Sequence, residues 1–268
     1  MLKTELNLPP KHTNSEPEIL VCCEPVVIIG ANGSGKSKLG FWIEQNQLNP
    51  KKLVHRISAQ KSLDFPDYVQ LKGLEQAENE LLGYVEPTLP ITERSVLTSK
   101  IWQRWPGSSR SNLDVGNALN DCEKALTLLF AKKSQRDSEI VKLVKEMEFE
   151  GKNEQVKVPN SPDEILLNIW EALLPHRKLV IENGQIKVLN PASNSSYQAR
   201  QMSDGERVAF YLMAQCLCVP DDSIVIVDEP EIHLHKSLMN EFWSKIEKAN
   251  LTACLFILLM TLILLLLE

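Results

Sequence analysis

Two short runs of aliphatic and β-branched residues, at 26–29 and 224–227, are the clearest hydrophobic features of the chain. The first run ends at a glycine and the second at two acidic residues. Continuous apolar runs of this length, bounded by turn or polar residues, predict fully buried strands of a parallel sheet. A helix is expected over residues 36–47, before Asn49 and Pro50, and residues 53–57 predict a further strand.

The stretch between residues 63 and 197 has a different pattern. It contains proline-rich turns among helical segments and little strand alternation, which predicts an inserted, largely helical lobe. Apolar residues at helical spacing predict one amphipathic helix, with Ile140, Leu143, Val144 and Met147 on its apolar side. A capping box at residues 161–164 predicts a second helix, which ends at Pro175. Asn183 and Gly184 lie between two apolar runs and predict a hairpin with a type I′ turn.

The composition is that of an ordinary globular protein, with 43% hydrophobic and 24% charged residues. A net charge of −6 argues against a basic nucleic-acid footprint over the whole chain, although local contact with nucleic acid stays open. The densest basic stretch is expected to be solvated surface, and it consists of Lys51, Lys52, His55, Arg56 and Lys61. The six cysteines lack metal-ligand spacing and indicate reduced, mostly buried thiols. Residues 1–25 have prolines and charges in place of an apolar signal core, so we expect a cytoplasmic protein with no membrane partner.

Directly after the first apolar run, the chain fits the phosphate-loop pattern G-x-x-x-x-G-K-S/T. Its glycines allow a tight turn in which successive N–H groups and a helix N-terminus face phosphate oxygens. We expect Lys36 to contact the β and γ phosphates of ATP and the Ser37 hydroxyl to bind Mg²⁺. A plain glycine-rich turn would not require the strand, the lysine and the serine together. The predicted nucleotide-binding residues are Gly30, Ala31, Asn32, Gly33, Ser34, Gly35, Lys36 and Ser37.

The second apolar run ends in the acidic pair Asp228 and Glu229. Two acids after a strand could be only a polar strand end, but a phosphate loop upstream favours a Walker B motif. Asp228 is then placed to bind Mg²⁺ through its water shell, and Glu229 to accept a proton from the attacking water.

Residues 201–207, Gln-Met-Ser-Asp-Gly-Glu-Arg, form a third motif. Ser203 and Glu206 have the spacing of a capping box for the helix that follows. The same residues resemble the signature motif of ABC-type ATPases, whose usual forms are L-S-G-G-Q and L-S-x-G-E, with Met202 in the leucine position. Both interpretations can hold together. In that family the helix N-terminus and the serine hydroxyl point at the γ-phosphate bound by the opposite subunit, which here implies Ser203 and Gly205.

The order of the motifs then resembles an ABC-type P-loop ATPase of the SMC- and OLD-like, AAA-related kind. Gln60 resembles the Q-loop glutamine that senses Mg²⁺ and the attacking water. His233 and His235 resemble the E-I-H-L-H form found after Walker B in OLD-type ATPases, and we expect them at a dimer interface. Residues 56–60, with Ser62, Leu63 and a proline after them, look like ATPases of anti-phage defence such as the ATPase component of PARIS systems.

The resemblance implies an α/β fold: an ABC-type P-loop core with a mainly parallel sheet and an inserted, largely helical lobe. Its expected parts are residues 1–62 (Walker A and Q-loop), 63–197 (lobe with a hairpin), 198–250 (signature, Walker B and D-loop) and 251–268 (apolar tail). It implies ATP and Mg²⁺ as cofactors, with Glu229 and Gln60 in hydrolysis. It also implies a nucleotide-dependent head-to-tail homodimer that controls an effector protein, for example a nuclease. A second hypothesis is an ATP-gated scaffold with little turnover. A transporter subunit is disfavoured by the sequence after Walker B and by the long lobe.

The almost purely apolar run from Leu251 to Leu267 is unusual for such a protein. ABC ATPases have a strand here that ends in Thr-His-Asp, and the chain has no histidine after His235. Codons for a strand ending in Thr-His-Asp, read one base later, can encode the observed peptide from Asn250 to Leu264. Because most residues have several codons, such a DNA sequence can be chosen to fit, and the fit alone is not proof of a shift. The run therefore has two interpretations, a shifted reading frame, which we favour, and a membrane tail anchor of nearly sufficient length. An out-of-frame tail is expected to leave sheet edges unpaired and to lower hydrolysis.

Overall fold

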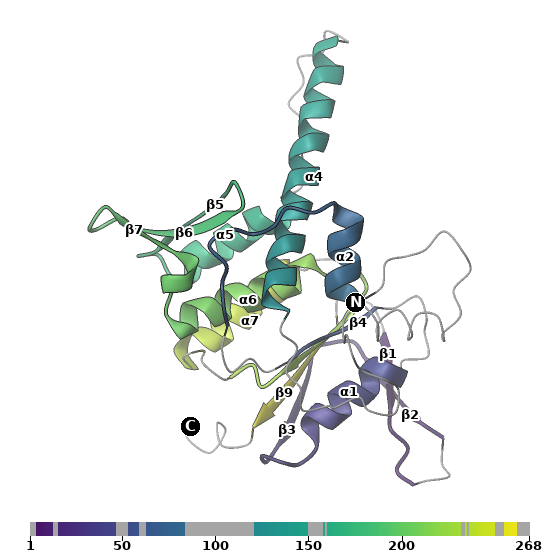
Figure 1. Ribbon diagram of the computed structural model, residues 1–268. Helices are drawn as coiled ribbons and strands as arrows, with labels where there is room; N and C mark the ends of the chain where they lie inside the picture. Colours follow the sequence, from purple (N-terminus) through teal and green to yellow (C-terminus); the bar gives the residue numbers. More distant parts are fainter. Residues whose placement is uncertain are drawn as a thin grey trace. The chain divides into compact units, whose positions relative to one another are not determined.

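The computed structural model describes residues 4–12, 16–46, 53–58, 63–83, 121–149, 158, 160–231, 234, 236–249 and 255–261 (Figure 1). The chain divides into two compact units. The sheet unit comprises Met1–Leu63, Leu82–Asn120 and Val219–Glu268, and the lobe unit comprises Asp64–Leu81 and Asp121–Cys218. Residues 198–218, which we grouped with the core from the sequence, fall in the lobe unit.

The sheet unit is built on a four-stranded, all-parallel sheet, so the fold belongs to the α/β class expected from the sequence. The strand order is β3 (Val26–Gly30), β9 (Leu255–Thr261), β8 (Ile224–Asp228) and β4 (Val54–Ile57). Helix α1 (Lys36–Asn46) follows β3, and helix α7 (Lys236–Ala249) lies between β8 and β9 in the chain. A separate antiparallel hairpin, β1 (Thr4–Leu8) and β2 (Glu18–Cys22), was not expected.

The core of this unit lies on the sheet face that carries α1. Part-buried residues of β1, β3 and α1 pack against its buried cluster, which consists of Leu6, Cys22, Ile43, Val54, Ile224 and Ile226. All five residues of β8 are buried, as a parallel strand covered on both faces should be.

Strand β3 departs from the prediction of full burial. Val26 and Ile28 pack on the cluster, but Val27 and Ile29 on the opposite face are 49% and 43% exposed. Since side chains alternate between the two faces of a strand, the helix that covers one face protects only every second residue.

The C-terminal apolar run also departs from expectation, because Leu255–Thr261 is not an unpaired tail. This segment forms β9, which pairs in parallel with β3 on one side and β8 on the other. A seven-residue apolar segment suits a central position in a parallel sheet, where both faces of a strand require apolar residues. Residues 251–254 and 262–268 lie outside the described part. Among the described helices, none combines the length and apolar character that a membrane crossing requires.

The lobe unit is largely helical, as predicted, with one small sheet. Its helices are α2 (Leu74–Leu82), α4 (Cys122–Phe149), α5 (Pro162–Leu173) and α6 (Asp204–Cys218), with the short 3₁₀ helix η1 (Ala199–Gln201). The rings of Phe65 and Trp170 pack edge-on against Phe210 at centroid distances of 5.7 and 6.3 Å. The Ser161 N–H donates to the Glu164 carboxylate at 2.8 Å, as expected for the capping box of α5.

The small sheet is antiparallel, with the order β5 (Lys178–Glu182), β6 (Gln185–Asn190) and β7 (Ser195–Gln198). The predicted turn between β5 and β6 is confirmed, because Asn183 and Gly184 both have positive φ, at 51° and 74°. A type I′ turn requires this at its two central positions. The third strand, β7, had no clear signal in the sequence.

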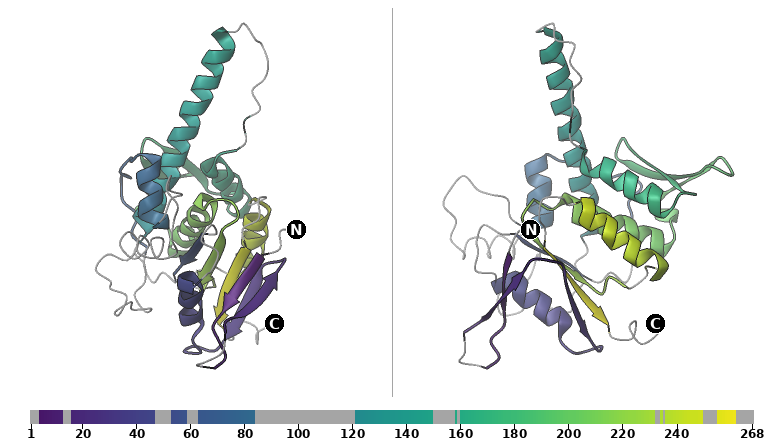
Figure 2. Two further views of the ribbon diagram at one scale, coloured as in Figure 1. Left: turned by 90° about the vertical axis from the view of Figure 1, so that its right-hand side faces the viewer. Right: turned by 180° about the vertical axis from the view of Figure 1, so that it is seen from behind.

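Helix α4 contains the predicted amphipathic segment, but its apolar side is not a buried face. The helix has 28 residues, and only the part up to Ala131 is buried. Val141, Leu143 and Val144 are 40–52% exposed and Phe149 is 95% exposed. Figure 2 shows this second half extending beyond α5 and α6 in both views. The described cysteines Cys22, Cys122, Cys216 and Cys218 are reduced and buried, as expected, whereas Cys23 is exposed.

Candidate functional site

The loop between β3 and α1 has the backbone that the glycine-rich motif predicts. Gly33 and Gly35 have φ values of +78° and +94°, in the left-handed region that other residues rarely adopt. The Ser34 N–H donates to the Ala31 carbonyl at 3.1 Å, and the Leu39 N–H donates to the Gly35 carbonyl at 2.9 Å. The chain therefore turns tightly and enters α1 directly, which leaves a helix N-terminus at the loop.

Two side-chain features adapt this loop to a ligand. At Gly30 a Cβ atom would lie 2.5 Å from the Ser34 hydroxyl oxygen, so any larger residue would require the Ser34 side chain to move. The Lys36 ammonium donates to the Gly30 and Ala31 carbonyls at 3.0 and 3.1 Å, so it lies across the mouth of the loop. A cation held there, beside backbone N–H groups, is suited to phosphate oxygens.

Strand register brings the loop and the acidic pair to the same edge of the sheet. Gly30 lies opposite Thr261 on β9, and Asp228 lies opposite Leu259 on the same strand. One strand thus separates the phosphate-loop strand from the acidic strand, a distance of about 10 Å across two strand spacings. The C-terminal end of β9 lies between them.

Asp228 belongs to a buried group of charges. Arg56 on β4 forms an ion pair with Glu44 of α1, with 3.2 Å between Nε and Oε2, and its Nη1 lies 3.9 Å from Asp228 Oδ2. The three side chains are at most 5% exposed. The expectation that this basic stretch is solvated surface is therefore wrong for His55 and Arg56, which are 0% and 2% exposed. Lys51, Lys52 and Lys61 lie outside the described residues.

The second carboxylate oxygen, Asp228 Oδ1, is buried and makes no hydrogen bond within the described part of the chain. A buried, unpaired carboxylate oxygen is costly unless something binds it. A hard cation such as Mg²⁺ prefers this kind of ligand and usually keeps several waters, so one or two protein ligands are enough. Asp228 and the half-buried Ser37 therefore fit a magnesium site, and the preceding loop fits the phosphates of a nucleotide.

The next residue, Glu229, has an unusual backbone. Its φ is 51°, which is uncommon for a residue with a Cβ and costs of order 1–3 kcal/mol. Its side chain is half-buried, in contrast to the buried Asp228 before it. The two neighbouring carboxylates therefore differ in exposure to solvent, which suits different tasks.

In the lobe unit, the predicted signature loop forms the N-terminus of α6. The Ser203 N–H donates to Glu206 Oε2 at 2.8 Å, and the Glu206 N–H donates to the Ser203 hydroxyl at 3.3 Å. The capping box predicted from the sequence is therefore present. The Ser203 hydroxyl also donates to Glu206 Oε2 at 2.9 Å, and Ser203 itself is exposed. Gly205 lies between them in the first turn.

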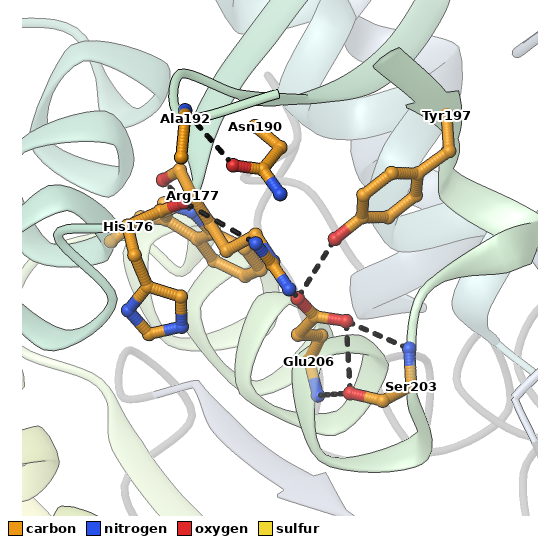
Figure 3. A network of polar contacts seen from close by, with 8 residues as sticks. His176, Arg177, Asn190, Ala192, Tyr197, Ser203 and Glu206 are labelled. Carbon is orange, nitrogen blue, oxygen red and sulfur yellow. Dashed lines mark hydrogen bonds and ion pairs between the residues drawn. The ribbon is translucent and has the colours of Figure 1, made fainter. Parts of the chain in front are cut away.

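Two residues outside the motif complete this network, and Figure 3 shows both pointing at the Glu206 carboxylate. The Tyr197 hydroxyl donates to Glu206 Oε1 at 3.0 Å, and Arg177 Nε lies 3.5 Å from the same oxygen. Burial opposes ionisation of Glu206, but the hydrogen bonds from Ser203 and Tyr197 and the charge of Arg177 outweigh it and lower the pKa of Glu206. Burial, followed by the bond to Glu206, raises the pKa of Tyr197. Sequence patterns gave no signal for either partner.

Three further predicted residues lie outside the described part of the chain, namely Gln60, His233 and His235. Their expected roles stay predictions.

Comparison with known proteins gives a partial match. Residues 133–248, less than half of the chain, match the family model described as "AAA domain, putative AbiEii toxin, Type IV TA system". No curated protein matches the chain.

Solved structures resemble it weakly. An SMC head bound to the C-winged helix domain of ScpA has a TM-score of 0.48 at 13% identity, covering 96% of this chain and 89% of that one. The SMC head domain from Thermotoga maritima has a TM-score of 0.44 at 14% identity, with coverages of 97% and 89%. A nucleotide-free ATP-binding cassette of an ABC transporter has a TM-score of 0.37 at 11% identity, with coverages of 97% and 81%. The functional proposal therefore rests on the residues of this chain.

Proposed function

We propose that the protein is an ATP-binding, Mg²⁺-dependent ATPase of the ABC type that works as a nucleotide-dependent head-to-tail dimer. The observation that supports this most strongly is the pairing of a phosphate loop with an acidic strand end at one edge of a parallel sheet. The loop has the two left-handed glycines and the Lys36 ammonium, and the acidic end has the buried Asp228 oxygen without a hydrogen bond in the described part.

The residues of the sheet unit divide the work of ATP binding. The eight residues of the loop (30–37) hold the triphosphate through backbone N–H groups, with Lys36 at the β and γ phosphates. Ser37 and Asp228 hold Mg²⁺, which neutralises charge that develops on the phosphates. Glu229 accepts the proton of the attacking water, and Gln60 helps to place that water.

The signature loop supplies the reason for a dimer. Ser203 and Gly205 lie in the lobe unit, at the exposed N-terminus of α6. A helix N-terminus with a solvent-exposed serine suits an anion, and the family resemblance places that anion on a second copy of the chain. Each composite site would then pair Lys36 and Glu229 of one copy with Ser203 of the other.

An effector protein would contact the lobe unit. The second half of α4 presents exposed apolar side chains, including Phe149 at 95% exposure, which is typical of an interaction surface. A role in anti-phage defence, as in PARIS-like systems, is supported by the resemblance of residues 56–60. The family model matched by residues 133–248 also names a toxin of a toxin–antitoxin system, which is in keeping with a partner-controlled ATPase.

One observation favours the second hypothesis, an ATP-gated scaffold with little turnover. The shifted-frame construction places the recovered Thr-His-Asp at positions 259–261, which is where β9 ends between Gly30 and Asp228. In the chain as it stands, position 260 is a methionine. The γ-phosphate contact expected at this point is therefore replaced by an apolar residue, which favours binding without efficient hydrolysis.

The decisive experiment compares ATP turnover with ATP-dependent dimerisation, using the protein and its Glu229→Gln variant. The ATPase proposal expects measurable phosphate release from the parent, and a variant that retains ATP and accumulates as a dimer in light scattering. Absence of ATP binding by both proteins would refute the proposal. A parent that dimerises with ATP and releases no phosphate would leave only the scaffold hypothesis.

The frame hypothesis has its own test, namely the DNA around codon 250 and a protein made with one base corrected there. Loss of one polar contact to transition-state charge costs roughly 10²–10³ in rate, so the corrected protein is expected to turn over ATP at least about 100-fold faster. Equal rates, or a stop codon directly after the corrected Thr-His-Asp, would count against a shifted frame.

A further inference from the structure

Each carboxylate of the signature loop is paired with an arginine. Arg207, in the same helix turn, lies 2.5 Å from Asp204. Glu206 is paired with Arg177, which comes from the loop between α5 and β5 and is 29 residues distant in the chain. Although the motif looks acidic in sequence, the folded loop therefore has its two negative charges offset.

The inference rests on the proposed dimer, in which the triphosphate bound by one copy approaches the signature loop of the other. The net charge of that loop therefore affects association. Like charges placed opposite one another across an interface oppose association. Asp204 is 75% exposed by side chain and Glu206 15%, so neither charge is far from the surface that a phosphate would approach. An uncompensated Glu206 would repel the nucleotide of the second copy.

We infer that Arg177 is the charge-compensating positioning residue of the signature loop, allowing Ser203 to engage the γ-phosphate of the ATP bound by a second copy of this chain. In this proposal Arg177 makes no contact of its own with the nucleotide or with magnesium. It acts through Glu206, whose other oxygen holds the Ser203 loop in place.

The hydrogen bonds of Ser203 give the inference a second basis. The Ser203 hydroxyl donates its one proton to Glu206 Oε2, and it must redirect that proton to reach a phosphate oxygen. Arg177 and Tyr197 approach the other oxygen, Oε1, at 3.5 and 3.0 Å. By drawing negative charge toward Oε1 they weaken Oε2 as an acceptor, which eases release of the hydroxyl.

The surroundings of Arg177 indicate that its side chain can be replaced without unfolding the protein. Its side chain is 30% exposed, and the contact that anchors this part of the loop, from Trp170 Nε1 to the Arg177 backbone carbonyl at 2.9 Å, survives replacement of the side chain. Arg177→Met is therefore expected to fold. Lys72→Met is a matched control, because Lys72 is 22% exposed, lies in the same unit and pairs at 2.6 Å with Glu80, which is not part of the signature loop.

The experiment measures the dissociation constant of the ATP-dependent dimer in a Glu229→Gln background, together with ATP affinity of the monomer. Arg177→Met should weaken the dimer roughly tenfold or more while leaving monomer affinity for ATP unchanged, since the opposed charges act only across the interface. Adding Glu206→Gln to Arg177→Met should restore the dimer to within about twofold of Glu206→Gln alone, because removing the carboxylate removes the need for compensation. Arg177→Lys and Lys72→Met should dimerise as the background does.

The possible failures are distinct. If the background protein itself stays monomeric with ATP, the proposed function fails. If the background dimerises and Arg177→Met dimerises equally well, the inference about Arg177 is wrong. It is also wrong if Glu206→Gln does not rescue Arg177→Met, or itself abolishes the dimer, because Arg177 would then have only a structural role.

Discussion

The buried arginine of the sheet unit offers a prediction whose size follows from the structure. Arg56→Met removes the positive charge that faces Glu44 at 3.2 Å and Asp228 at 3.9 Å, where all three side chains are at most 5% exposed. Breaking a buried ion pair by deleting one partner typically costs about 3–5 kcal/mol, because the other charge stays buried without it. The Glu44 pair should provide most of this cost, since Asp228 is farther away and is expected to gain Mg²⁺.

Thermal unfolding followed by circular dichroism would test this. A loss of that size should lower the melting temperature by roughly 6–20 °C for a chain of this length. Because the chain has two compact units and Arg56 belongs to the sheet unit, the change should appear in the transition of the sheet unit.

The matched control is the double variant Arg56→Met with Glu44→Leu, which removes both members of the shorter pair. Replacing both partners by apolar residues is often neutral, so the double variant should regain much of the lost stability. A single variant that melts within about 2 °C of the parent, or a double variant no more stable than the single, would refute the account of Arg56 as a buried counter-charge.

Three further predictions concern the two motif loops. Lys36→Ala should abolish binding of a fluorescent ATP analogue, since it removes the charge at the β and γ phosphates, and unchanged affinity would contradict the phosphate-loop assignment. Ser203→Arg should leave ATP binding by the monomer intact but prevent ATP-dependent dimerisation, and a variant that dimerises like the parent would rule out the signature role. Because the folded pKa of Glu206 is lowered, its bonds stabilise the lobe unit fully above the unfolded value of about 4.5 and less as pH falls through the lowered one. Melting temperatures should accordingly fall less between pH 7 and pH 4 in Glu206→Gln than in the parent, and parallel curves would disprove this linkage.

Much of the fold was predictable because its signals are local. The phosphate loop, the turn at Asn183 and Gly184, and the capping box of Ser203 each depend on residues within a few positions of one another. Local chemistry of this kind determines backbone conformation directly, so a single sequence is enough.

The contacts that sequence analysis missed join distant positions. Arg56 looked like part of a basic surface stretch, and only the packing of α1 over β4 shows that Glu44 accompanies it into the core. Arg177 and Tyr197 reach Glu206 because the small sheet and α6 belong to one unit, which no spacing rule reveals. The exposed half of α4 was misjudged for a related reason, since an apolar stripe predicts a helix but does not identify what covers it.

Strand β9 shows that a central strand of a parallel sheet places few constraints on its amino-acid sequence. Pairing with β3 and β8 requires backbone hydrogen bonds and apolar side chains of about the right size. Many seven-residue segments meet both requirements. A peptide from a shifted reading frame could therefore occupy this central position as readily as the peptide of the original frame. Expression yield, solubility and even nucleotide affinity are then expected to be the same with either peptide in the position of β9. The two peptides differ in function only at the C-terminal end of β9, where hydrolysis requires a polar group next to the γ-phosphate. The rate of ATP turnover is the measurement that detects this group.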